Sequence, residues 1–208
     1  MPKATVFHLD AQHPNLKRLP RVIDALENGS VVLYPTDTVY GFACDPLQKK
    51  AIDKIHALKN LGPKHMFSFV CSDISQAAQF VDIDNSLFSI LKRILPGPYT
   101  IILEANKKVP RVLLQNRKEV GIRVPDSPVA QYLSQSIGRP LLSTSVVDFD
   151  GNAILDPEEM IEIYGERVSY IIEQGFLGDD VSTVLRYMDG EWEIIREGKG
   201  SIDFLEDI

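Results

Sequence analysis

Residues 34–42 read Tyr34-Pro35-Thr36-Asp37-Thr38-Val39-Tyr40-Gly41-Phe42, and they mark the end of a predicted strand. The apolar residues 30–33 that precede them are typical of a β-strand. Pro35 ends this strand, because proline has no backbone N–H to donate to a central ladder. Ligands of α/β proteins often bind where a strand gives way to a polar turn. The stretch is therefore a candidate site, and a solvated turn between two strands is the alternative.

Composition indicates a single globular domain. The chain has 208 residues, of which 44% are hydrophobic, enough for one sizeable core. We expect the domain to span residues 14–200, with terminal extensions at 1–13 and 201–208. No apolar run has the length of about 20 residues that a membrane span needs, and the N-terminus lacks the apolar segment of a signal peptide. We expect a cytoplasmic protein with no membrane partner.

Cys44 and Cys71 are the two cysteines of the chain. Two cysteines supply neither a disulfide framework nor a set of metal ligands. They fit small buried residues better, and no metal site is predicted.

Charge is unevenly distributed along the chain. The formal net charge of −7 argues against nucleic acid as a partner of the whole surface. Residues 1–147 nevertheless carry 18 Lys and Arg against 12 Asp and Glu, whereas residues 148–208 carry 4 against 17. Eight of the cations lie within residues 92–123. This asymmetry indicates a basic face for an anionic ligand, although any single lysine also fits a solvated surface.

The apolar pattern predicts a mixture of helices and strands. Helices are expected within residues 19–26, 47–58, 74–80, 87–94 and 129–137, and from the capping residue Asp156 onward. Strands are expected at residues 5–9, 30–33, 67–70, 99–103, 120–124, 141–145 and 170–172. Asp189-Gly190 predicts a hairpin between residues 182–187 and 192–196. Together these elements predict an α/β fold of the α+β type: a twisted, mixed β-sheet flanked by helices.

The stretch YPTDTVYGF resembles the signature of the YrdC family, whose members include the threonylcarbamoyl-AMP synthases of tRNA modification. Further similar motifs follow in the family's order: Lys59 after a helix, then residues 96–100 (PGPYT), 121–125 (GIRVP), 143–145 (STS), 182–184 (STV) and 196–198 (REG). The resemblance extends from about residue 20 to residue 200, and residues 65–68 are most similar to the YciO branch. It implies a single-domain YrdC-like fold with a basic concave cleft.

The resemblance also implies a chemistry. Family synthases join L-threonine, bicarbonate and ATP, which would make this chain a nucleotidyltransferase that uses ATP with Mg²⁺. Such phosphoryl chemistry depends on positioning and cationic neutralisation more than on a covalent nucleophile, and we assign no catalytic residue. The resemblance places Thr36, His65, Arg123, Ser143 and Ser182 at the small-molecule substrate. It places Lys59, Ser145 and Arg196 at the nucleotide.

Several of these residues have an ordinary structural explanation as well. Lys59 at a helix C-terminus would also favour the helix dipole. Ser143 and Ser145 would also suit the end of a strand. Arg123 alternates with apolar neighbours, so it points either to solvent or into a cleft. His65 has no acid near it in sequence to orient it as a base, and we interpret it as a turn or cleft residue.

Two positions depart from the pattern of the synthases. Family synthases bind ATP with a Lys-x-Arg and a Ser-x-Asn element. Here Leu61 stands at the Arg position and Val147 at the Asn position. Losing a charged hydrogen-bonding partner typically costs about 1.5–3 kcal/mol. We therefore expect weak nucleotide binding and little synthase activity, unless Lys64, His65 or the basic region at 92–123 compensates.

The resemblance further implies a surface that binds double-stranded RNA, such as tRNA, through its backbone and shape. The candidate contacts are Lys92, Arg93, Lys107, Lys108 and Arg111. Two functions thus remain open. The first is an RNA-binding protein that retains a nucleotide or adenylate pocket, and the second is a divergent but active threonylcarbamoyl-AMP synthase.

Overall fold

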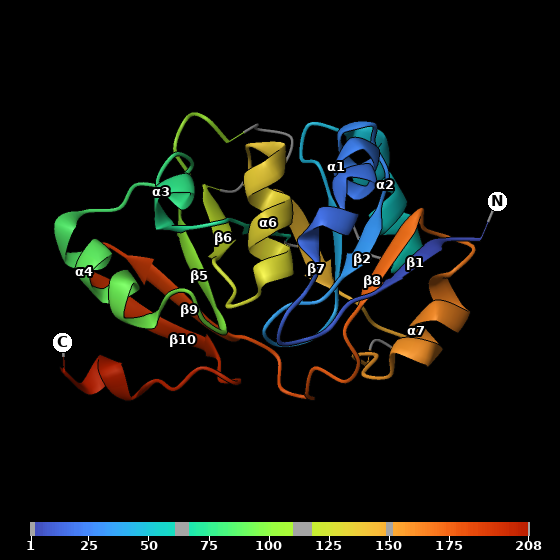
Figure 1. Cartoon of the computed structure of the whole chain (residues 1–208). Coiled ribbons are helices and arrows are strands. Elements are labelled where there is room, and N and C mark those ends of the chain that lie inside the picture. Colours follow the sequence, from blue (N-terminus) through green and yellow to red (C-terminus); the bar gives the residue numbers. More distant parts are fainter. Residues whose placement is uncertain (1–2, 61–66, 110–117, 149–151, 208) are drawn as a thin grey trace.

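The computed structural model describes residues 3–60, 67–109, 118–148 and 152–207. Within them, ten strands form one mixed sheet in the order β1-β8-β2-β3-β7-β4-β6-β5-β9-β10, and six α-helices pack around it (Figure 1). This single-domain mixed α/β architecture confirms the predicted fold class.

The strands are β1 (Thr5–His8), β2 (Val32–Tyr34), β3 (Gly41–Cys44), β4 (Ser68–Val70), β5 (Tyr99–Glu104), β6 (Glu119–Arg123), β7 (Leu141–Ser145), β8 (Tyr170–Glu173), β9 (Thr183–Met188) and β10 (Glu191–Arg196). The α-helices are α1 (Pro20–Glu27), α2 (Lys49–Leu58), α3 (Ile74–Ala77), α4 (Asn85–Ile94), α6 (Pro128–Ile137) and α7 (Pro157–Tyr164). Two 3₁₀ segments, η1 (Leu16–Arg18) and η2 (Asp203–Asp207), complete the described elements.

Local sequence signals explain many of these boundaries. β2 ends at Tyr34, before the predicted proline break. The Asp156 carboxylate accepts a hydrogen bond of 2.9 Å from the Glu158 N–H and caps α7. Asp189 and Gly190 take φ angles of 53° and 86°, as the turn between β9 and β10 requires. The α3 helix is shorter than predicted and ends at Ala77.

The centre of the sheet is buried on both faces, as the fully buried strands β2 and β3 show. Val32 and Tyr34 of β2 pack into a core that α1 and α6 share, whereas Leu33 between them joins the larger core on the opposite face. That larger core also receives apolar side chains from α2, α4 and α7. Because both faces are covered there, a central strand such as β2 is apolar on both sides, and simple alternation is lost.

Both chain ends contribute to this fold. β1 forms the edge of the sheet and pairs in parallel with β8, with Thr5 opposite Tyr170. Near the other end, Phe204 of η2 packs edge-on against the rings of Tyr99 and Trp192.

No helix in the described ranges combines the length and the apolar character that crossing a membrane would require.

The signature stretch occupies the middle of the sheet. It connects β2 to β3, a strand that the sequence pattern did not predict, and β3 pairs antiparallel with β7. Thr36 is only 6% exposed and Thr38 only 1%. The alternative of a solvated turn is therefore wrong.

Candidate functional site

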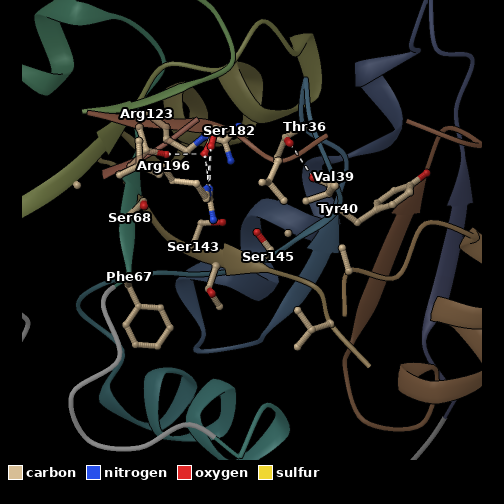
Figure 2. Close-up of a pocket in the computed structure, with 18 of the residues that line it drawn as sticks. Thr36, Val39, Tyr40, Phe67, Ser68, Arg123, Ser143, Ser145, Ser182 and Arg196 are labelled. Carbon is tan, nitrogen blue, oxygen red and sulfur yellow. Dashed lines mark hydrogen bonds between the residues drawn. The ribbon is translucent and has the colours of Figure 1, made fainter. Parts of the chain in front are cut away.

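A cavity of about 450 Å³ lies beside the loop that joins β2 to β3 (Figure 2). Seven of the eight predicted substrate and nucleotide residues line it: Thr36, Lys59, Arg123, Ser143, Ser145, Ser182 and Arg196. The eighth, His65, lies outside the described residues. The sheet order thus brings together motifs that are far apart in the sequence, whereas the individual roles of these residues stay predictions.

Hydrogen bonds fix the shape of the loop between β2 and β3. Thr36 Oγ1 donates to the Val39 carbonyl at 2.7 Å and accepts from the Thr38 N–H at 3.1 Å. The Thr36 and Thr38 hydroxyl oxygens lie 3.0 Å apart. The wall of the cavity at Thr36 is therefore set before any ligand arrives.

Arg123, at the end of β6, points into the cleft rather than to solvent. Its Nη2 donates to Asp37 Oδ1 at 2.9 Å and to Thr38 Oγ1 at 3.0 Å. The other oxygen of Asp37 accepts from the Asp126 N–H at 3.0 Å. The buried Nε of Arg123 has no hydrogen-bond partner among the residues that the structure describes. Sequence reasoning missed the role of Asp37, and its place between two threonines of the signature was the available signal.

Arg196, at the end of β10, lies near Arg123 and also lines the cavity. Its Nε and Nη2 donate to the Ser182 carbonyl at 3.1 and 2.8 Å, and Nη2 also lies 3.2 Å from Ser182 Oγ. Ser182 Oγ in turn is 2.9 Å from Thr100 Oγ1 of β5. Burial and the nearby charge of Arg123 lower the pKa of Arg196.

Lys59 follows α2 directly and enters the cavity from another side. Its Nζ donates to Thr144 Oγ1 at 2.9 Å and to the Ser145 carbonyl at 2.6 Å. Burial lowers the pKa of Lys59 to about 8. No Asp or Glu lies among the described residues that line the cavity, so its charge meets only neutral oxygens there.

The floor of the cavity depends on Gly41 of β3. A Cβ atom at this position would come within 2.9 Å of the Tyr34 ring and 3.1 Å of Ser143 Oγ, so any larger residue would displace one of them. Ser143 Oγ donates to the Phe42 carbonyl at 2.9 Å and lies 2.8 Å from the Tyr34 hydroxyl. Burial raises the pKa of Tyr34 to about 12, so the phenol stays protonated at neutral pH.

Apolar side chains line part of the wall as well. Val147, at the position where the resemblance implies an asparagine in the synthases, lines the cavity and forms an antiparallel bridge with Ala153. Leu61, the other departure, lies outside the described residues. Val147 carries no polar side-chain group with which to bind a nucleotide.

The predicted RNA contacts are separate from the cavity. Lys92 and Arg93 lie in the last turn of α4, and Lys107 and Lys108 follow β5. All four are exposed and none lines the cavity. Arg111 lies outside the described residues. Their role in RNA binding stays a prediction.

Cys44 and Cys71 are both buried and unpaired, as the sequence indicated. Burial raises the pKa of each thiol, which keeps it protonated. Among the described residues, no group of three or more His, Cys, Asp or Glu is arranged to hold a metal ion.

Comparison with known proteins agrees with this architecture. The model of the Telomere recombination (Sua5/YciO/YrdC) family matches residues 24–198. The uncharacterized protein YciO of Escherichia coli K12 is 35% identical over 199 residues, covering 94% of this chain and 96% of its own length. Its crystal structure matches with a TM-score of 0.89 at 34% identity, over 96% of this chain and 98% of its own.

Two further relatives carry functional names. A threonylcarbamoyl-AMP synthase of Vibrio vulnificus is 29% identical over 160 residues, covering 76% of this chain and 86% of its own. The structure of P. abyssi Sua5 complexed with L-threonine matches with a TM-score of 0.88 at 22% identity, over 98% of this chain and 60% of its own. The chain belongs to the Sua5/YciO/YrdC family and is related to the threonylcarbamoyl-AMP synthases.

Proposed function

We propose that the cavity binds an anionic small molecule with an amino-acid part and a nucleotide part, of the kind that threonylcarbamoyl-AMP synthases handle. One observation carries the proposal: Lys59 and Arg196 enter a cavity whose described lining contains no acid. Cations held by neutral oxygens in a partly dry cavity attract carboxylate and phosphate groups.

The two ends of the cavity suit the two parts of such a ligand. Thr36, Arg123, Ser143 and Ser182 supply hydroxyls and a guanidinium that can hold an amino acid by its carboxylate and hydroxyl. The L-threonine bound in P. abyssi Sua5 supports an amino acid as one ligand. His65 is a further candidate at this end.

Lys59, Ser145 and Arg196 would contact the nucleotide. Since no carboxylate lines the described cavity, Mg²⁺ would be carried by the phosphates of ATP rather than by protein ligands. Both ATP and tRNA fit the cytoplasmic location that the sequence favours.

Within this function, we infer that synthase activity is weak. Val147 would give the nucleotide an apolar contact where the synthase pattern has an amide. Leu61 stands where that pattern has the guanidinium of an arginine. Each lost contact lowers affinity for ATP or for the transition state by about tenfold or more.

Pyrophosphate release from ATP tests this function. The rate is measured with and without L-threonine and bicarbonate, beside titrations of ATP and L-threonine. We expect both ligands to bind and release to be slow. Release that requires both threonine and bicarbonate, at the rate of the V. vulnificus synthase, would instead establish the divergent active synthase. A wild-type protein that binds neither ligand would refute the function itself.

Restoring the synthase residues sharpens the test. The double variant Leu61→Arg with Val147→Asn should raise ATP affinity more than either single variant alone, because both side chains would contact one ligand. Thermal unfolding identifies the competing result, in which new polar groups meet an apolar wall and only destabilise the fold. A double variant that folds normally without gaining affinity would mean that the cavity serves another ligand.

A second function, binding of double-stranded RNA, is supported by the exposed Lys92, Arg93, Lys107 and Lys108. Arg111 is the fifth candidate. If these cations contact phosphates, the affinity for duplex RNA should fall steeply with added salt, by about 0.9 log unit per log unit of salt for each phosphate neutralised if duplex RNA follows B-DNA. Lys107→Glu with Lys108→Glu should weaken binding of all duplex sequences alike. Binding that is absent at low salt, or insensitive to salt, would exclude this function.

A further inference from the structure

Lys199 links the segment after β10 to the loop between β2 and β3, although no motif of the sequence singled it out. Its Nζ donates to the backbone carbonyl of Asp37 at 2.6 Å, across 162 positions of sequence. We propose that Lys199 is a positioning residue that holds the signature loop so that Asp37 keeps Arg123 oriented toward the amino-acid end of the cavity. The inference deepens the proposed function and rests on it.

The backbone at Lys199 is itself firmly held. Its N–H donates to the Val181 carbonyl at 2.9 Å. The neighbouring Gly198 N–H donates to Thr183 Oγ1 at 3.0 Å, and a Cβ atom on Gly198 would lie 2.3 Å from the Val181 oxygen. The chain therefore packs tightly against the start of β9, and Lys199 extends from a fixed base.

At the other end, Asp37 is held at three points. Its carboxylate accepts hydrogen bonds from Arg123 Nη2 at 2.9 Å and from the Asp126 N–H at 3.0 Å. Its carbonyl accepts from Lys199. The first two contacts fix the side chain, and the third fixes the peptide group that carries it. Without the third, the loop can rotate and take the acceptor of Arg123 with it.

The contact also joins two segments that border the cavity. Thr36, next to Asp37 in the chain, and Arg196, three residues before Lys199, both line the cavity. Lys199 is exposed, and an exposed contact of this kind contributes little to global stability. Its effect should therefore fall on the geometry of the site rather than on the fold.

Two substitutions of Lys199 test whether its hydrogen bond, rather than its aliphatic chain, positions the loop. Lys199→Met keeps the aliphatic chain and removes the donor, whereas Lys199→Arg can still donate to the carbonyl. Lys50→Met, at an exposed lysine near the start of α2, is the matched control. Calorimetric titration of the full chain with L-threonine and, separately, with ATP measures each variant, and thermal unfolding reports stability.

We expect Lys199→Met to weaken L-threonine binding about three- to tenfold. ATP affinity should stay within about twofold of wild type, because Lys59 and Arg196, the two cations assigned to the nucleotide, keep their own hydrogen bonds to Thr144 and Ser182. Lys199→Arg should restore threonine binding, and all variants should unfold at the wild-type temperature. An unchanged threonine affinity, or an equal loss for both ligands, would overturn the inference.

Hydrogen exchange tests this contact without a ligand. In Lys199→Met, the Thr38 amide, which donates to Thr36 Oγ1, should exchange faster than in wild type or Lys50→Met. Unchanged exchange would overturn the inference even if the wild type bound neither ligand. The two failures can be told apart. If the proposed function is wrong, the wild type binds neither ligand, whereas if this inference is wrong, the exchange of the Thr38 amide is unchanged.

Discussion

Two regions of the molecule hold their cations with different kinds of hydrogen-bond acceptor: a carboxylate in one region and neutral oxygens in the other. Between the end of α6 and β3, Arg139 donates to the carboxylate of Asp45 through Nε at 2.9 Å and Nη2 at 2.6 Å. At the cavity, in the described part of the chain, Lys59 and Arg196 donate only to hydroxyl and carbonyl oxygens. The first arrangement is complete within the protein, and the second leaves positive charge for a ligand.

The pKa values of these cations shift in opposite directions because their surroundings differ. The hydrogen-bonded Asp45 carboxylate raises the pKa of Arg139. Burial lowers the pKa of Lys59 to about 8, and burial together with Arg123 lowers that of Arg196. An anion entering the cavity would reverse the shift at Lys59, because an opposite charge favours the charged form. The Arg139–Asp45 pair is thus satisfied within the fold, whereas Lys59 and Arg196 are the cavity cations that we propose for ligand binding.

The largest expected effect comes from breaking the structural pair with Asp45→Ala. The Asp45 side chain is 1% exposed and that of Arg139 is 29% exposed. Removing one partner of a buried pair costs about 3–5 kcal/mol, and the partial exposure of Arg139 places the loss near the lower end. Urea unfolding should show this loss, with no change in ATP or L-threonine affinity.

Asp53→Ala, at an exposed position of α2, controls for the loss of an acid. A loss of stability below about 1 kcal/mol in Asp45→Ala, the range of surface pairs, would remove the structural half of the comparison.

The next effect concerns binding. Lys59→Met removes a cation that has no acidic partner in the cavity, and ATP affinity should fall about 10- to 30-fold. The free energy of unfolding should stay the same or rise, since a desolvated charge is lost. A titration of ATP beside urea unfolding measures both. A variant that loses stability and keeps its ATP affinity would assign Lys59 to the fold.

A smaller effect should appear in the pH dependence of stability. The pKa of Lys59 is lowered from 10.5 to about 8 in the folded state. Between these values the unfolded chain binds more protons, so raising the pH stabilises the folded protein; below about pH 8 the lysine is charged in both states and its cost is constant. The stability of wild type relative to Lys59→Met should therefore rise by about 1 kcal/mol between pH 8 and pH 9.

The tyrosines Tyr34 and Tyr40, whose pKa values burial raises to about 12, titrate in both proteins and cancel in this difference. A difference that stays flat with pH would show that the Lys59 ammonium is not desolvated.

Local signals in the sequence predicted the local structure well. Pro35, Asp156 and the pair Asp189-Gly190 act within a few residues, and each marks a boundary seen in the fold. Motif order also placed distant residues such as Thr36 and Arg196 in one cavity.

Pairing over long distances could not be predicted in this way. No local sequence pattern indicates that β3 lies between β2 and β7. For the same reason, the contacts of Asp37 with Arg123 and with Lys199 were missed, since they join segments 86 and 162 positions apart. The exposed cations within residues 92–123 were predicted from charge, and charge alone does not show which face they occupy.

Proton uptake on ATP binding shows whether the Lys59 ammonium group meets an anion in the cavity. Calorimetric titrations at pH 8, in buffers of different ionisation enthalpy, give the number of protons taken up per ATP bound. Lys59 is about half protonated at this pH, so an anion that raises its pKa should draw about half a proton from the buffer. We expect this proton uptake in wild type and no uptake in Lys59→Met. ATP binding without uptake, or equal uptake in both proteins, would contradict it.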